Sequence, residues 1–77
     1  MSDLEHEKAR LDEIVEQIGV AEARVAGQEA LIDELRKDGR PTRLAEQTLG
    51  VLERAVYTLH GHLEVIRYVI TKKERAK

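Results

Sequence analysis

The stretch IDELRKDGRPTRLAEQTLGVL, residues 32–52, contains the one proline of the chain, between two long runs of regularly spaced aliphatic residues. Gly39 can supply the left-handed conformation that ends many helices. Pro41 cannot continue a helix and disfavours helical dihedral angles at the residue before it. Thr42 is a natural N-cap for a new helix. The sequence therefore predicts two helices joined by a turn at 39–41, which is short enough to make them antiparallel neighbours.

Aliphatic residues recur at alternating spacings of three and four on both sides of this turn, which is typical of helices with one apolar seam each. The spacing predicts a first helix over about 3–38 and a second over about 42–74. The seam of the first helix consists of Leu4, Leu11, Ile14, Ile18, Ala21, Val25, Gln28, Ile32 and Leu35. The seam of the second helix consists of Ala45, Leu49, Leu52, Val56, Leu59, Leu63, Ile66 and Ile70. We therefore expect an all-α, antiparallel, coiled-coil-like hairpin that forms a single domain over residues 1–77.

The matched lengths of the two helices also predict the register of the hairpin. Residues whose numbers sum to about 80 or 81 should lie at the same level, as Ile18 does with Leu63. This register places Glu7 opposite Lys73 at the open end of the hairpin. We expect a solvated ion pair there, worth about 0.2–1 kcal/mol.

The second helix carries more apolar surface than one partner helix can cover. A second stripe lies beside its seam and consists of Leu44, Val51, Ala55, Thr58, Val65 and Val69. Val15 and Leu31 flank the seam of the first helix. Such width is typical of helices with two neighbours, as in a four-helix bundle. We therefore predict a homodimer of two hairpins, with docking of the second stripe onto a larger, unidentified protein as the alternative.

Composition makes oligomerisation the expected route to stability. One hairpin of 77 residues has only a small hydrophobic core. Because the chain has no cysteine, neither a disulfide nor a thiolate–metal site can stabilise it. Residues 1–38 hold eleven acidic against five basic residues, whereas residues 39–77 hold four against eight. This asymmetry favours pairing of one helix with the other. Because no apolar run is long enough for a membrane span and no signal-peptide pattern occurs, we expect cytoplasmic residence without membrane contact.

No grouping of residues predicts catalysis, a cofactor or a metal site. His60 and His62 point about 200° apart on a helix, and His60 with Glu64 is an incomplete ligand set. Ser2 is the only serine, so a serine–histidine–acid triad is not expected, and no glycine-rich phosphate loop occurs. We expect a non-enzymatic protein whose function is protein interaction and self-assembly.

Gln28 is the one uncharged polar residue well inside the first seam. A polar residue at a core position can specify register and oligomeric state. We expect Gln28 either to hydrogen-bond across a dimer axis or to lie partly exposed at the edge of the seam.

Nucleic-acid binding is the alternative function. The predicted architecture resembles that of small RNA-binding hairpins that dimerise into four-helix bundles. Basic residues of the second helix and of a basic tail over 72–77 are available to phosphates, namely Arg43, Arg54, Arg67, Lys72, Lys73, Arg75 and Lys77. The acidic first helix opposes such binding.

A pattern of spaced residues in the middle of the chain covers roughly residues 21–63. It consists of Glu22, Arg24, Val25, Gln28, Leu31, Ile32, Leu35, Gly39, Thr42, Ala45, Leu49 and Leu52. In these residues the chain resembles a set of short, uncharacterised bacterial helical-hairpin proteins. It differs from them at Ala21 and Gly27, where the set often has Gly and Arg. The resemblance implies a helical hairpin and no particular activity.

Overall fold

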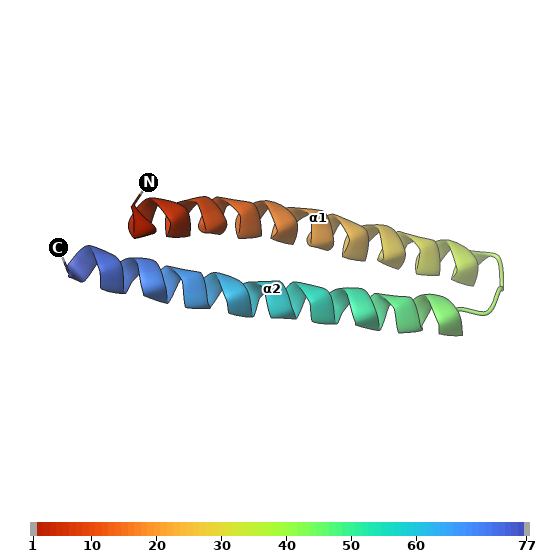
Figure 1. The fold of residues 1–77 in the computed structure, drawn as a ribbon. Helices are drawn as coiled ribbons and strands as arrows, with labels where there is room; N and C mark the ends of the chain where they lie inside the picture. Colours follow the sequence, from red (N-terminus) through yellow and green to blue (C-terminus); the bar gives the residue numbers. More distant parts are fainter. Residues whose placement is uncertain (1, 77) are drawn as a thin grey trace.

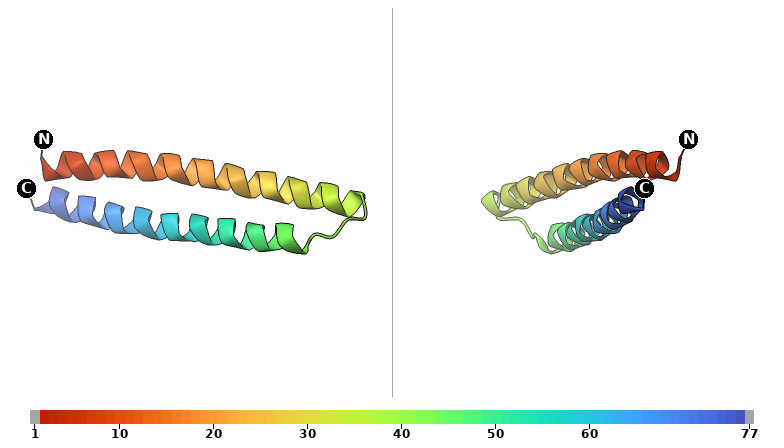
Figure 2. Two further views of the ribbon diagram at one scale, coloured as in Figure 1. Left: turned by 45° about the vertical axis from the view of Figure 1, so that its right-hand side comes forward. Right: turned by 90° about the vertical axis from the view of Figure 1, so that its left-hand side faces the viewer.

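The computed structural model describes residues 2–76 as two helices, α1 (Asp3–Lys37) and α2 (Arg43–Arg75), and no strand occurs within that range. The helices run antiparallel and side by side, so that both ends of the chain lie opposite the turn (Figure 1). The extents of 61 × 15 × 13 Å describe a thin rod, which the two further views in Figure 2 show from other sides. The predicted all-helical hairpin is confirmed.

Both ends of α1 are closed by local hydrogen bonds. The backbone N–H of Glu5 donates to Ser2 Oγ at 3.2 Å, which satisfies one of the free donors of the first turn. At the other end Gly39 has φ 67°, a left-handed conformation that suits glycine. The N–H of Gly39 bonds the carbonyl of Arg36 at 3.0 Å, and the N–H of Arg40 bonds that of Leu35 at 2.8 Å. This pair of bonds is a Schellman motif, which ends α1 and reverses the chain.

The start of α2 differs from the expectation. Thr42 is the N-cap residue, but its side chain makes no capping hydrogen bond. Its ψ of −1° lies outside the extended region in which an N-cap hydroxyl faces the free N–H groups of the first turn. The carbonyl of Thr42 accepts from the N–H of Glu46 at 2.8 Å, so the backbone alone begins the helix. α2 runs from Arg43 to Arg75, within one residue of the predicted range of about 42–74, and it includes most of the basic tail.

The two seams form the contact between the helices. Every predicted seam residue is buried or half-buried. The most buried side chains, with at most 9% of their surface exposed, are Leu4, Ile18, Ile32, Leu63, Ile66 and Ile70. Yet among the described residues no side chain is enclosed to below 2% exposure. Each helix therefore has a covered side, but the contact between the two helices encloses no described side chain completely.

The contacts between the helices agree with the predicted register in some pairs and depart from it in others. Ile14 and Ile66 line one hollow together, and Val25 and Val56 line another. At the turn end, Arg36 Nη2 lies 2.7 Å from Glu46 Oε1 on the other helix. In these pairs the residue numbers sum to about 80–82, whereas Leu4 clusters with Ile66 and Ile70 and Gln28 bonds the carbonyl of Ala45, with sums of 70–74.

The ion pair predicted between Glu7 and Lys73 is wrong. Glu7 Oε1 instead lies 3.2 Å from Arg10 Nη1 on the same helix, and its side chain is only 14% exposed. The pair that joins the helices at the open end is Lys8 Nζ with Glu74 Oε2, at 3.7 Å. Arg10 lies three residues from Glu7 on the same helix and is within reach. A bond from Lys73 would instead cost the conformational entropy of ordering its long side chain across the seam.

Candidate interaction surface

The hairpin presents two long faces, one on each side of the plane that contains its helices. Antiparallel helices bring matching flanks of their seams together, so each face combines one flank of α1 with one flank of α2. We call the first the ionic face, which consists of Lys8, Val15, Glu22, Glu29, Arg36, Glu46, Glu53 and Glu74. We call the second the apolar face, which consists of the second stripe of α2 and of Arg10, Gln17, Val20, Arg24 and Leu31 of α1.

Among the described residues two ion pairs join the helices, and both lie on the ionic face, at opposite ends of the rod. These are Lys8 with Glu74 and Arg36 with Glu46. Between them, Glu22, Glu29 and Glu53 line a hollow beside Val25 and Val56. This face is therefore charged along its length and already used for contacts within the hairpin.

The apolar face leaves large aliphatic side chains in solvent. Leu44 is 78% exposed, Val51 62% and Val65 63%. Ala55 is also exposed, and Val69 is half-buried at the edge of the seam. These residues of the second stripe therefore lie beside the seam, and most of their surface is exposed to solvent. A run of this length on one face is typical of an interaction surface.

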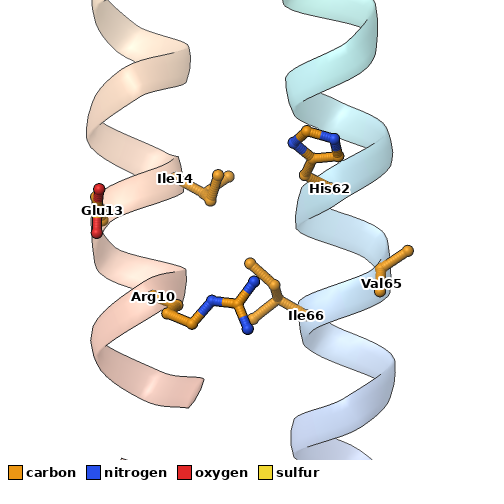
Figure 3. A pocket seen from close by; sticks show the side chains of 6 residues that line it. All are labelled: Arg10, Glu13, Ile14, His62, Val65 and Ile66. Atoms are coloured by element: carbon orange, nitrogen blue, oxygen red, sulfur yellow. The ribbon is translucent and has the colours of Figure 1, made fainter. Parts of the chain in front are cut away.

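Two shallow hollows open on the apolar face. The first, of about 340 Å³, is lined by Arg10, Glu13, Ile14, His62, Val65 and Ile66. Figure 3 shows Ile14 pointing toward α2 and the Arg10 side chain reaching across the gap toward Ile66. The second, of about 450 Å³, lies further toward the turn and is lined in part by Val20, Ala55 and Leu59. Because both are open grooves with mixed lining, they suit inserted side chains better than an enclosed small molecule.

Val20 is a residue of this face that sequence reasoning missed. It is 51% exposed and lies on α1 beside Ala55 of α2, in the second hollow. The heptad spacing alone did not mark it, because it belongs to neither seam. Its spacing from Leu31 could have indicated its place, since residues eleven apart lie on the same side of a helix.

Gln28 is half-buried, and its amide is used within the hairpin. Its Nε2 donates to the carbonyl oxygen of Ala45 on α2 at 2.9 Å. This bond leaves the second hydrogen of Nε2 and the Oε1 oxygen for other partners, so the expected bond across a dimer axis stays a prediction. The half-buried position of Gln28 agrees with the alternative, partial exposure at the edge of the seam.

The outward side of α2, opposite its seam, combines positive charge with aromatic rings. Arg54, Tyr68 and Arg75 recur there at multiples of seven residues. Tyr57 is 83% exposed and Tyr68 64%, and the Lys72 Nζ lies 5.7 Å from the centre of the Tyr68 ring.

The other basic residues predicted to contact phosphates differ in how accessible they are. Arg67 lies 3.5 Å from Glu64 of the same helix, and Lys73 is half-buried in the seam. Arg43 is exposed at the start of α2, whereas Lys77 lies outside the described residues.

The histidines form no metal site in the part of the chain that the structure describes. No group of three or more His, Cys, Asp or Glu side chains gathers there. His60 and His62 are both exposed, and only His62 lines the first hollow of the apolar face.

No described helix is both long and apolar enough to cross a lipid bilayer. No protein-family model, curated protein or solved structure matches this chain at a significant level. The resemblance to short bacterial hairpin proteins therefore stays a prediction, and function has to be argued from the surface.

Proposed function

We propose that this chain is a non-enzymatic interaction module that assembles with a second copy of itself into a dimeric, antiparallel four-helix bundle. The observation that carries the proposal is the exposure of Leu44, Val51 and Val65 in one line on α2. Their burial against a second hairpin would supply the layer that the single hairpin lacks.

The total surface area supports the same proposal. A compact folded monomer of 8.8 kDa exposes about 4,800 Å². This chain exposes 5953 Å², which exceeds that value by roughly 1,200 Å². A standard protein interface buries about 800 Å² on each partner. The rod can therefore lose the area of a typical interface and still expose what a compact protein of its mass does.

The test is the mass of the protein in solution, measured by light scattering over a hundredfold range of concentration. We expect a dimer of constant mass at micromolar concentration and above. A stably helical monomer throughout the range would contradict self-assembly. In that case the apolar face would have to be covered by another protein, and capture experiments should use that face as bait.

A second candidate function is favoured by the outward side of α2. Arg54 and Arg75 together with the exposed Tyr57 and Tyr68 combine cations with rings on which bases can stack. This side faces away from the seam and would stay in solvent in the proposed dimer. We propose RNA binding here as the alternative, tested by a gel shift over a range of salt. Binding must weaken steeply with salt and with Arg54→Gln, whereas no shift at low salt would dismiss it.

A further inference from the structure

We propose that the second copy packs with its α2 antiparallel against α2 of the first, about a two-fold axis that passes beside Thr58. The two turns then lie at opposite ends of the bundle. This inference rests on the proposed self-assembly and adds to it the contact, the direction and the register of the partner.

The symmetry of the second stripe points to this axis. Leu44, Val51, Thr58 and Val65 follow one another at intervals of seven, with Lys72 next. Thr58 is the midpoint of this series. A two-fold axis beside it brings Val51 of each copy opposite Val65 of the other, and Thr58 opposite its own equivalent. At the two ends of the series, Leu44 of each copy packs against the aliphatic stem of Lys72 of the other copy.

The alternative direction matches the surfaces poorly. If both turns lay at the same end, the second stripe would face the flank of α1 that carries Arg10, Gln17 and Arg24. Valines would then cover charged groups, which lose water without gaining partners.

The positions of the two hollows on the apolar face agree with this arrangement. The hollow lined by Ala55 and Leu59 adjoins Thr58, so it flanks the axis. The hollow lined by His62 and Val65 (Figure 3) lies under Val51 of the second copy. A valine side chain entering a groove of this kind is knobs-into-holes packing.

Single cysteines test the axis directly, because the chain has none of its own. We expect Thr58→Cys to form a disulfide-linked dimer in high yield under mild oxidation. The matched control is Tyr57→Cys, one residue along the same helix and 83% exposed on its outward side, for which we expect at least tenfold less linkage. Arg40→Cys, in the turn, should not link either, because the turns are at opposite ends. Linkage through Arg40→Cys but not through Thr58→Cys would overturn the proposal.

A mixture of two variants tests the register. Neither Val51→Cys nor Val65→Cys should link with itself, but the two mixed together should link with each other. Circular dichroism of each variant establishes that the helices are intact. If the unmodified protein is a dimer yet Thr58→Cys behaves as Tyr57→Cys does, the arrangement is wrong and self-assembly stands. If the unmodified protein is a monomer, self-assembly itself fails.

Discussion

The two faces of this hairpin share the same helices and the same register but have opposite surface chemistry. The ionic face carries the two ion pairs that join α1 and α2, at 2.7 Å near the turn and at 3.7 Å near the open end. The apolar face contains no such pair among the described residues, and its α2 side is a line of exposed aliphatic residues.

This difference suggests a division of roles between the faces. Exposed ion pairs contribute little stability, but they favour one register of the two helices over others. Apolar side chains contribute stability in proportion to the area they bury, and they contribute little until a partner covers them. On this argument the ionic face helps to set how α1 pairs with α2, and the apolar face would provide the free energy of the proposed assembly.

The largest effect is expected from a charge in the seam that lies between the two faces. Leu59→Asp places an unpaired carboxylate among half-buried aliphatic residues, which should lower the free energy of unfolding by about 3 kcal/mol. Circular dichroism melts at one fixed protein concentration should show the loss. Tyr57→Asp introduces the same residue on the outward side of the same helix and should change the melt little. An unchanged melt for Leu59→Asp would show that the seam is assigned wrongly.

The second-largest effect is expected from a charge on the apolar face, and it distinguishes that face from the ionic face. Val65→Lys on the apolar face should weaken the dimer about 30-fold, or about 2 kcal/mol, because it places a cation inside the proposed interface. Val15→Lys is the matched control, since Val15 is 53% exposed on the ionic face and Val65 is 63% exposed. Sedimentation equilibrium measures both dissociation constants. Equal weakening by the two substitutions would remove the distinction between the faces.

The sequence could predict the hairpin because its main signals are local. Heptad spacing indicates which side of each helix is covered, and Gly39 with Pro41 indicates where the chain reverses. The burial of Leu4, Ile18 and Ile66 follows from these signals alone. The second stripe was also visible, because it repeats at helical spacing on one helix.

The failures concern side chains that have a choice of partner. Glu7 can reach Arg10 on its own helix, and spacing along two seams does not show which of several cations it selects. Gln28 was expected at a dimer axis or at the seam's edge; it is half-buried, and its bond to a backbone carbonyl of α2 was not predicted. Val20 joins the apolar face only once the antiparallel pairing sets which flank of α1 adjoins Ala55.

A smaller effect is expected from Gln28, whose amide donates to Ala45 of the other helix at 2.9 Å. Gln28→Leu removes this bond and adds apolar surface to the seam. The Ala45 carbonyl also belongs to the hydrogen-bond ladder of α2, so it keeps a donor. We expect the free energy of unfolding to change by about 1 kcal/mol or less. A loss well above that in thermal melts would mean that the amide fixes the register of the hairpin.

The smallest effect is expected on the ionic face. The side chains of Arg36 and Glu46 are 61% and 47% exposed, so Arg36→Glu should lower the free energy of unfolding by about 0.5 kcal/mol at low salt. The loss should shrink at high salt, because exposed charges are screened. Combining Arg36→Glu with Glu46→Arg restores the attraction but reverses two favourable contacts with the helix dipoles, since Arg36 ends α1 and Glu46 begins α2. The double variant should therefore recover only part of the loss in urea melts, with no change in the dimer dissociation constant. A change in that constant would show that the ionic face also takes part in assembly.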